Sequence, residues 1–208
     1  MARPKRQDGR RRELVAAAQR AIVRFGADGA LLQRIAAEAG LAPQTVSYYY
    51  PDISALVTDA VRQAMDRFYT ERAAAVEAFQ GSTPQRLRLL IEHGLPTGVD
   101  DDDVRMLCEL GGAAARMPSV AALLSTLFDR EVSLYVVLLE RGSSEGVFAL
   151  RMQAEQAAQN LVSLEDAYGY RVMGGHPSIT PGRATDLVVA MAEVIVGCPL
   201  PAISRDST

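Results

Sequence analysis

Hydrophobic side chains recur every three or four residues along nearly the whole chain, the spacing that places them on one face of an α-helix. The first stripe predicts a helix over residues 11–25. A shorter stripe over residues 32–39 ends at Gly40, a residue type that favours the left-handed conformation of a helix C-terminus. Pro43 suits the first turn of a third short helix, which Pro51 stops.

Apolar positions after Pro51 continue the helical spacing, with Asp52 placed to cap a long helix that Gly81 ends. Asp103 is expected to cap a later helix. The remaining predicted helices cover residues 84–94, 104–117, 120–142, 152–173 and 181–196. No run alternates as a strand would, and no segment repeats at a fixed period. The pattern predicts an all-α protein of about nine helices.

The composition is typical of a globular chain of one or two domains, with 49% hydrophobic residues among 208 and a net charge of −3. No stretch reaches the roughly 18 apolar residues of a spanning helix, and no apolar segment of a secretory signal follows the basic start. Cys108 and Cys198 lie far apart without a C-x-x-C spacing, which fits a reducing compartment. We therefore expect a cytoplasmic protein without membrane contacts.

Charge is divided unevenly along the chain. Residues 1–50 contain nine Lys or Arg against four Asp or Glu, a balance of +5, so the remainder carries −8. A basic head on an acidic body is expected where one part meets a polyanion. Residues 1–9 are predicted to form a disordered basic arm, for which a solvated tail without a partner is an equal alternative.

The short helices at residues 32–39 and 43–50 have the pattern of a helix-turn-helix. Gly40 makes the tight turn, Leu41 fills the angle between the helices, and Val46 anchors the second helix on the core. The opposite face of that helix carries neutral polar and aromatic side chains, which suit base edges and phosphates. They are Gln44, Thr45, Ser47, Tyr48 and Tyr49.

This segment resembles the DNA-binding domain of the TetR family of bacterial transcriptional repressors. The likeness covers about residues 10–68 and rests on the motif Ile35-Ala36-x-x-Ala39-Gly40-Leu41-(x)3-Thr45-Val46-(x)2-Tyr49-Tyr50. It implies a helix-turn-helix domain over residues 10–52, a linker helix over 53–80, and a ligand-binding and dimerisation domain over 81–208. It also implies a homodimeric repressor that a small-molecule effector releases from a pseudo-palindromic operator.

Several positions depart from the family pattern. Tyr48 stands where a His is common, and Pro51-Asp52 replaces a Lys that would contact a phosphate. Ser47 replaces a Tyr near the groove, so that base recognition there is weaker or mediated by water. Leu31 replaces a capping Thr at the second helix, which costs about 1 kcal/mol.

The resemblance and the charge pattern together give a candidate DNA-binding set. Thr45 and Tyr49 match phosphate contacts of the family. Positive charge in the Arg10–Arg12 run opposes the helix dipole, which favours a phosphate partner over a merely solvated helix start. Tyr50 is expected to pack in the core. Core packing is also the alternative to DNA contact for Tyr48 and Tyr49. The set is Arg10, Arg11, Arg34, Pro43, Gln44, Thr45, Ser47, Tyr48 and Tyr49.

The body of the chain is expected to enclose an effector pocket and to form the dimer. Ordinary core packing is the alternative for each pocket residue. Pocket candidates are Phe68, His93, Met106, Leu110, Phe128, Tyr135 and Tyr168. The last two helices carry broad apolar faces, which the resemblance assigns to a four-helix dimer interface. Interface candidates are Leu161, Leu164, Leu187, Met191, Val194 and Ile195.

Two segments of the body, residues 164–170 and 177–181, are weakly similar to the choline-responsive BetI repressors, although the scarcity of aromatic residues disfavours an aromatic cage for a quaternary ammonium ligand. No catalytic triad, metal-ligand spacing or phosphate-cradling glycine motif is present, so we expect neither an enzyme nor a metal or cofactor. The alternative function is a constitutive or activating DNA-binding regulator whose C-terminal domain binds a protein partner or no effector.

Overall fold

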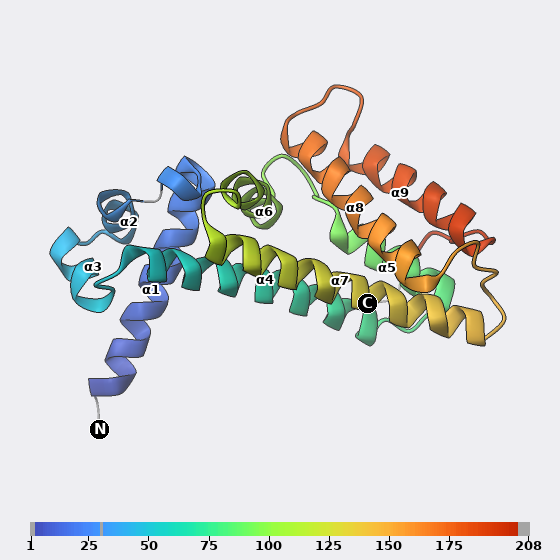
Figure 1. Cartoon of the computed structure of the whole chain (residues 1–208), viewed down its shortest axis with the longest axis horizontal. Coiled ribbons are helices and arrows are strands. Elements are labelled where there is room, and N and C mark those ends of the chain that lie inside the picture. The colour runs from blue at the N-terminus through green and yellow to red at the C-terminus, as the bar shows by residue number, and fades with distance from the viewer. Residues whose placement is uncertain (1–2, 30, 204–208) are drawn as a thin grey trace. The chain divides into compact units, whose positions relative to one another are not determined.

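The computed structural model describes residues 3–29 and 31–203. Within these residues the chain folds into nine α-helices and one 3-10 turn, without a strand (Figure 1), which confirms the all-α prediction. The helices are α1 (Arg3–Phe25), α2 (Leu32–Ala39), α3 (Pro43–Tyr49), α4 (Ile53–Ala78), α5 (Thr83–Gly94), α6 (Asp102–Ala113), α7 (Pro118–Ser144), α8 (Ala154–Met173) and α9 (Pro181–Val196).

Helix α1 begins earlier than predicted. It starts at Arg3 and not at residue 11, so residues 3–9 are helical and do not form the expected disordered arm. Arg, Lys and Gln are good helix formers, and Pro4 falls in the first turn, where its missing N–H is not needed. Residues 1 and 2 of the predicted arm lie outside the described residues.

Acidic side chains begin two of the helices. Asp52 Oδ1 accepts a 2.8 Å hydrogen bond from the Ser54 N–H, as expected for the cap of α4. At α6 the capping side chain is Asp101, whose Oδ1 accepts from the Val104 N–H at 3.2 Å, so the predicted role of Asp103 was wrong. The helix begins two residues earlier than predicted, at Asp102, which moves the capping position from residue 103 to residue 101.

The described chain divides into two compact units. The first comprises the residues up to Arg67 together with Arg105–Ser125, and the second comprises Phe68–Val104 and the residues from Thr126 onward. Helices α4, α6 and α7 therefore contribute to both units, and most of α6 groups with the helix-turn-helix. These limits differ from the division at residues 52 and 80 expected from the sequence.

The first unit packs α1, α2 and α3 around small and branched side chains. Leu14, Ile22 and Ile35 are fully buried, and so is Leu56 at the start of α4. The Gln19 side chain donates to the Ala60 carbonyl at 3.0 Å, which ties α1 to α4. This core holds the helix-turn-helix against its neighbours.

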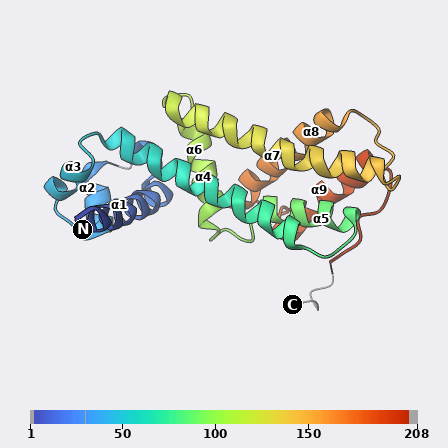
Figure 2. The ribbon, with the colours of Figure 1, turned by 90° about the horizontal axis from the view of Figure 1, so that it is seen from below.

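The second unit is built on α5, α7, α8 and α9. Helices α8 and α9 run side by side in both views of the ribbon (Figures 1 and 2), and their inner faces join one continuous apolar core. The segment between α7 and α8 is fastened to this pair, because the Ala149 N–H donates to the Val196 carbonyl at 2.8 Å. Among the described residues, no helix combines the length and apolarity needed to cross a membrane.

Candidate DNA-binding surface and ligand cavity

A left-handed glycine sets the angle between α2 and α3. Gly40 has φ 64° and ψ 33°, a conformation that costs little only for a residue without a Cβ. Its N–H and that of Leu41 return to carbonyls of the last turn of α2. Leu31 begins α2 without a side-chain cap, as expected from its apolar side chain.

Helix α3 buries one face and exposes the other. Val46 is fully buried, whereas Tyr48 keeps 69% of its surface exposed. Gln44 is also exposed, and the remaining predicted contact residues of this helix are half-buried. These are Pro43, Thr45, Ser47 and Tyr49. None of the predicted DNA-contact side chains of α3 is fully buried in the described structure.

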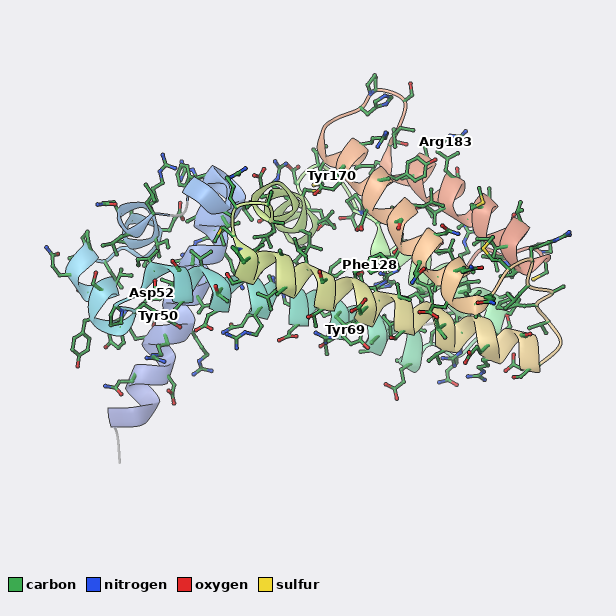
Figure 3. The ribbon with its side chains drawn as sticks, viewed as in Figure 1. Tyr50, Asp52, Tyr69, Phe128, Tyr170 and Arg183 are labelled. Atoms are coloured by element: carbon green, nitrogen blue, oxygen red, sulfur yellow. The ribbon has the colours of Figure 1, made fainter. Side chains whose placement is uncertain are left out.

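Tyr50 belongs to the core, as expected. Its hydroxyl donates to Asp59 Oδ2 at 3.1 Å, and it lies beside Asp52 at the start of α4 (Figure 3). Burial, followed by the hydrogen bond to Asp59, raises the pKa of Tyr50 above its usual value. The Arg11 guanidinium lies 5.2 Å from the centre of the Tyr50 ring and 3.4 Å from the Tyr49 carbonyl, so Arg11 braces the end of α3.

Several arginines of the basic head already have partners. Glu38 on α2 accepts from Arg20 and Arg24 of α1, at 3.4 Å and 3.2 Å. Sequence reasoning missed this clamp, because residues on different helices show no spacing signal. Arg10 pairs with Glu13 at 2.5 Å within α1. These ion pairs hold the arginine side chains in place, and they leave the balance of +5 unchanged because it already counts Glu13 and Glu38.

Arg34 lies at the junction of α1 and α2. Its guanidinium donates to the Gly29 carbonyl at 3.0 Å and stacks 4.6 Å from the centre of the Phe25 ring. These contacts order the side chain, while it remains exposed. A DNA contact by Arg34 stays a prediction.

The second unit contains an open cavity of about 320 Å³. Of the seven predicted pocket residues, only Phe68 and His93 line it. Burial, with the nearby positive charge of Arg72 as the next cause, lowers the pKa of His93 below its usual value, so the imidazole is neutral at pH 7. The full lining is Phe68, Glu71, Arg72, Glu92, His93, Leu95, Thr97, Asp101, Asp103 and Val104.

The other five predicted pocket residues lie elsewhere. Met106 and Leu110 are buried on α6 within the first unit, which removes them from this cavity. Phe128 and Tyr168 pack against the core of the second unit, and Tyr135 is fully buried in a polar network. Periodicity identifies an inward face of a helix but cannot say whether a core or a cavity lies beneath it.

That polar network surrounds Arg72, a buried arginine on α4. Its guanidinium reaches Glu131 on α7 at 2.7 Å, Glu165 on α8 at 2.7 Å, and the Leu90 carbonyl on α5 at 2.9 Å. The Tyr135 hydroxyl donates to Glu165, completing the cluster. Sequence reasoning missed this cluster, whose members lie as many as 93 residues apart.

Two carboxylates share one positive charge in this cluster. Burial raises the pKa of Glu165 to about 7 and also raises that of Glu131, against the opposing attraction of Arg72. A side chain on Gly94 would collide with Arg72 and Glu165, so a glycine there makes room for the pair. The cluster joins α4, α5, α7 and α8 within the second unit.

The predicted interface residues fall into two groups. Leu161 and Ile195 are core residues of the second unit, so their assignment to an interface was wrong. Leu164 and Leu187 are half-buried. Met191 and Val194 on α9 expose 45% and 64% of their surfaces. On α8, Tyr170 projects outward and is also exposed (Figure 3).

No protein-family model and no curated protein match this sequence. Solved structures do match its fold. A protein from Saccharomonospora viridis described as a transcriptional regulator, crystallised with choline, is 23% identical over 89% of this chain and 96% of that chain, with a TM-score of 0.81. A TetR transcription regulator from Haloarcula marismortui is 22% identical over 91% of this chain and 99% of its own, with a TM-score of 0.78.

A TetR-like regulator from Rhodococcus matches at 23% identity and a TM-score of 0.66, covering 87% of this chain and 92% of that chain. Identities of this size support a common fold, and the high coverage extends it over both units. The fold implied by the resemblance of the helix-turn-helix residues is thereby confirmed, and the chain has the fold of the TetR-family transcriptional regulators.

Proposed function

We propose that this protein is a DNA-binding transcriptional regulator that acts as a homodimeric repressor. The observation that carries the proposal is the outward face of α3. Gln44 and Tyr48 are exposed there, on a helix that Val46 anchors and Gly40 orients. Neutral donors, acceptors and aromatic rings on one short helix are suited to the major groove. Two such helices in a dimer bind half-sites about 34 Å apart.

The second unit supplies the regulation. A small molecule in the cavity beside Phe68 and His93 lowers the affinity for the operator, because it binds preferentially to a conformation that does not fit DNA. The neighbour crystallised with choline supports a ligand site in this fold. Dimerisation uses the exposed apolar side chains Met191 and Val194 of α9, together with half-buried neighbours.

Titration of the full chain with DNA from upstream of its own gene tests the DNA-binding function. Fluorescence anisotropy is expected to show tight binding whose logarithm falls linearly with the logarithm of the salt concentration, as released counterions require. A scrambled duplex serves as control and is expected to bind at least about 1000-fold more weakly. Equal affinity for both duplexes, or binding unaffected by salt, contradicts the proposal.

A further inference from the structure

The lining of the cavity is strongly acidic. Four of its side chains are carboxylates: Glu71 on α4, Glu92 on α5, and Asp101 and Asp103 beside and within the start of α6. No lysine of the described residues lines the cavity. The charge of its only arginine, Arg72, is taken up by two buried glutamates outside the lining. The lining therefore attracts a cationic ligand and repels an anionic one.

The residues that line the cavity favour an organic cation over a metal ion. Among the residues that the structure describes, no group of three or more His, Cys, Asp or Glu side chains is arranged to hold a metal. Phe68, Leu95 and Val104 add apolar surface to the same cavity. A hydrocarbon chain that bears a charged nitrogen satisfies both kinds of surface.

The kind of nitrogen follows from the acceptors. Quaternary ammonium ions have no N–H and are recognised by several aromatic faces, but Phe68 is the only Phe, Tyr or Trp in the lining. An ammonium with N–H groups instead donates charge-assisted hydrogen bonds to carboxylates. The neutral imidazole of His93 adds a further acceptor without adding positive charge.

The carboxylates differ in how far they are engaged. Both oxygens of Asp101 accept hydrogen bonds from Thr97 and Val104, and Glu92 pairs with Arg88 at 2.8 Å. Within the described part of the chain, Glu71 makes neither a hydrogen bond nor an ion pair. Glu71 is thus the acceptor in the lining that a ligand can use without displacing an existing partner.

We propose that this cavity binds a small organic amine whose ammonium groups carry N–H, with Glu71 as the main acceptor and Phe68 and Leu95 against the hydrocarbon chain. The inference rests on the proposed function, because it names the chemical class of the effector of that same site. The excess of carboxylates over cations favours a diamine over a monoamine.

Isothermal titration calorimetry of the full chain with 1,4-diaminobutane tests the ligand class. Its fully N-methylated analogue has the same charge and chain length but no N–H. Saturable binding of the diamine is expected, and methylation should weaken it about tenfold or more, the value of one lost charge-assisted hydrogen bond. Equal or tighter binding of the methylated analogue overturns the inference, and so does an absence of saturable diamine binding.

Glu71→Gln is expected to weaken diamine binding about tenfold, with an unchanged melting temperature because Glu71 has no partner to lose. Glu77→Gln on the same helix is the matched control, since Glu77 lines a separate groove and should leave binding unchanged. Equal effects of both substitutions refute the role of Glu71.

The operator assay separates the two proposals. Operator binding that a neutral or anionic compound abolishes, without any effect of the diamine, leaves the regulatory function standing and refutes the amine class. Saturable diamine binding by a protein that does not bind its upstream DNA supports the cavity assignment and refutes the regulatory function.

Discussion

Individual side chains of α3 divide into those that hold the helix and those that it presents. Val46 and Tyr50 face the core, and Arg11 braces Tyr50 and the Tyr49 carbonyl from α1. Gln44 and Tyr48 are exposed, and the Tyr48 ring meets the Tyr49 ring edge to face with 5.1 Å between their centres. Substitution of an exposed side chain tests DNA recognition with little effect on folding, whereas substitution of Arg11 would disturb both.

Gln44 and Thr45 are predicted to contribute differently to DNA binding. Gln44→Ala should cost about 1–3 kcal/mol on the operator and little on scrambled DNA, because a base-edge contact is lost. Thr45→Ala should weaken binding to both duplexes by a similar factor, because a phosphate contact carries no sequence information. Fluorescence anisotropy on the two duplexes measures the ratio. Equal losses for Gln44→Ala would contradict its role in base recognition.

Among the elements, α4, α5, α7 and α8 meet at the Arg72 cluster. A buried arginine shared by two glutamates costs desolvation free energy, and it stabilises the fold only while all the partners are present. Because Glu165 has a pKa of about 7 when folded and 4.5 as its ordinary value, the folded chain binds protons more strongly than the unfolded chain. The stability that proton binding at Glu165 contributes is therefore present below about pH 4.5 and is lost as the pH rises toward 7.

Arg72→Met is predicted to destabilise the second unit in a pH-dependent manner. At pH 8 the loss should be about 3–5 kcal/mol, because two buried carboxylates remain without their cation. At pH 5 the loss should be smaller, since protonation neutralises them. Urea denaturation at the two pH values measures both losses. Arg141→Met removes an exposed ion pair with Glu145 and is the control, with a small effect at either pH. A loss independent of pH would contradict this account of the cluster.

At the scale of the whole molecule, the net charge of −3 conceals a basic head and an acidic remainder. The basic head contains the helix-turn-helix, and within it Glu38 pairs with Arg20 and Arg24. The acidic remainder includes the cavity carboxylates. In the proposal above, this negative charge attracts a cationic ligand to the cavity.

Dimerisation through α9 is predicted to depend on its exposed apolar side chains. Val194→Glu should halve the molecular mass measured by light scattering and weaken operator binding, because a charge in an apolar interface is left unpaired. Val137→Glu on α7 is the matched control, since Val137 is equally exposed at 64% and lies outside the proposed interface. An unchanged mass for Val194→Glu, or an equal loss for Val137→Glu, would place the interface elsewhere.

The sequence by itself determined the features that depend on neighbours a few residues away. The helical periodicity, the left-handed turn at Gly40, the Asp52 cap and the two faces of α3 all follow from residue types at local spacings. The exposed face of α3 could therefore be predicted from the sequence, and its contact with DNA stays a prediction. The early start of α1 was missed because the apolar spacing that was used to define helices does not extend to residues 3–9.

The tertiary structure decided everything that depends on which helix faces which. Arg72 and Glu165 lie 93 residues apart, and no spacing rule links them. Met106 and Leu110 have the periodicity of pocket residues, yet their part of α6 belongs to the first unit. Periodicity gives each helix an inward face, but only the packing of helices distant in sequence determines whether that face meets a core, a cavity or a buried ion pair.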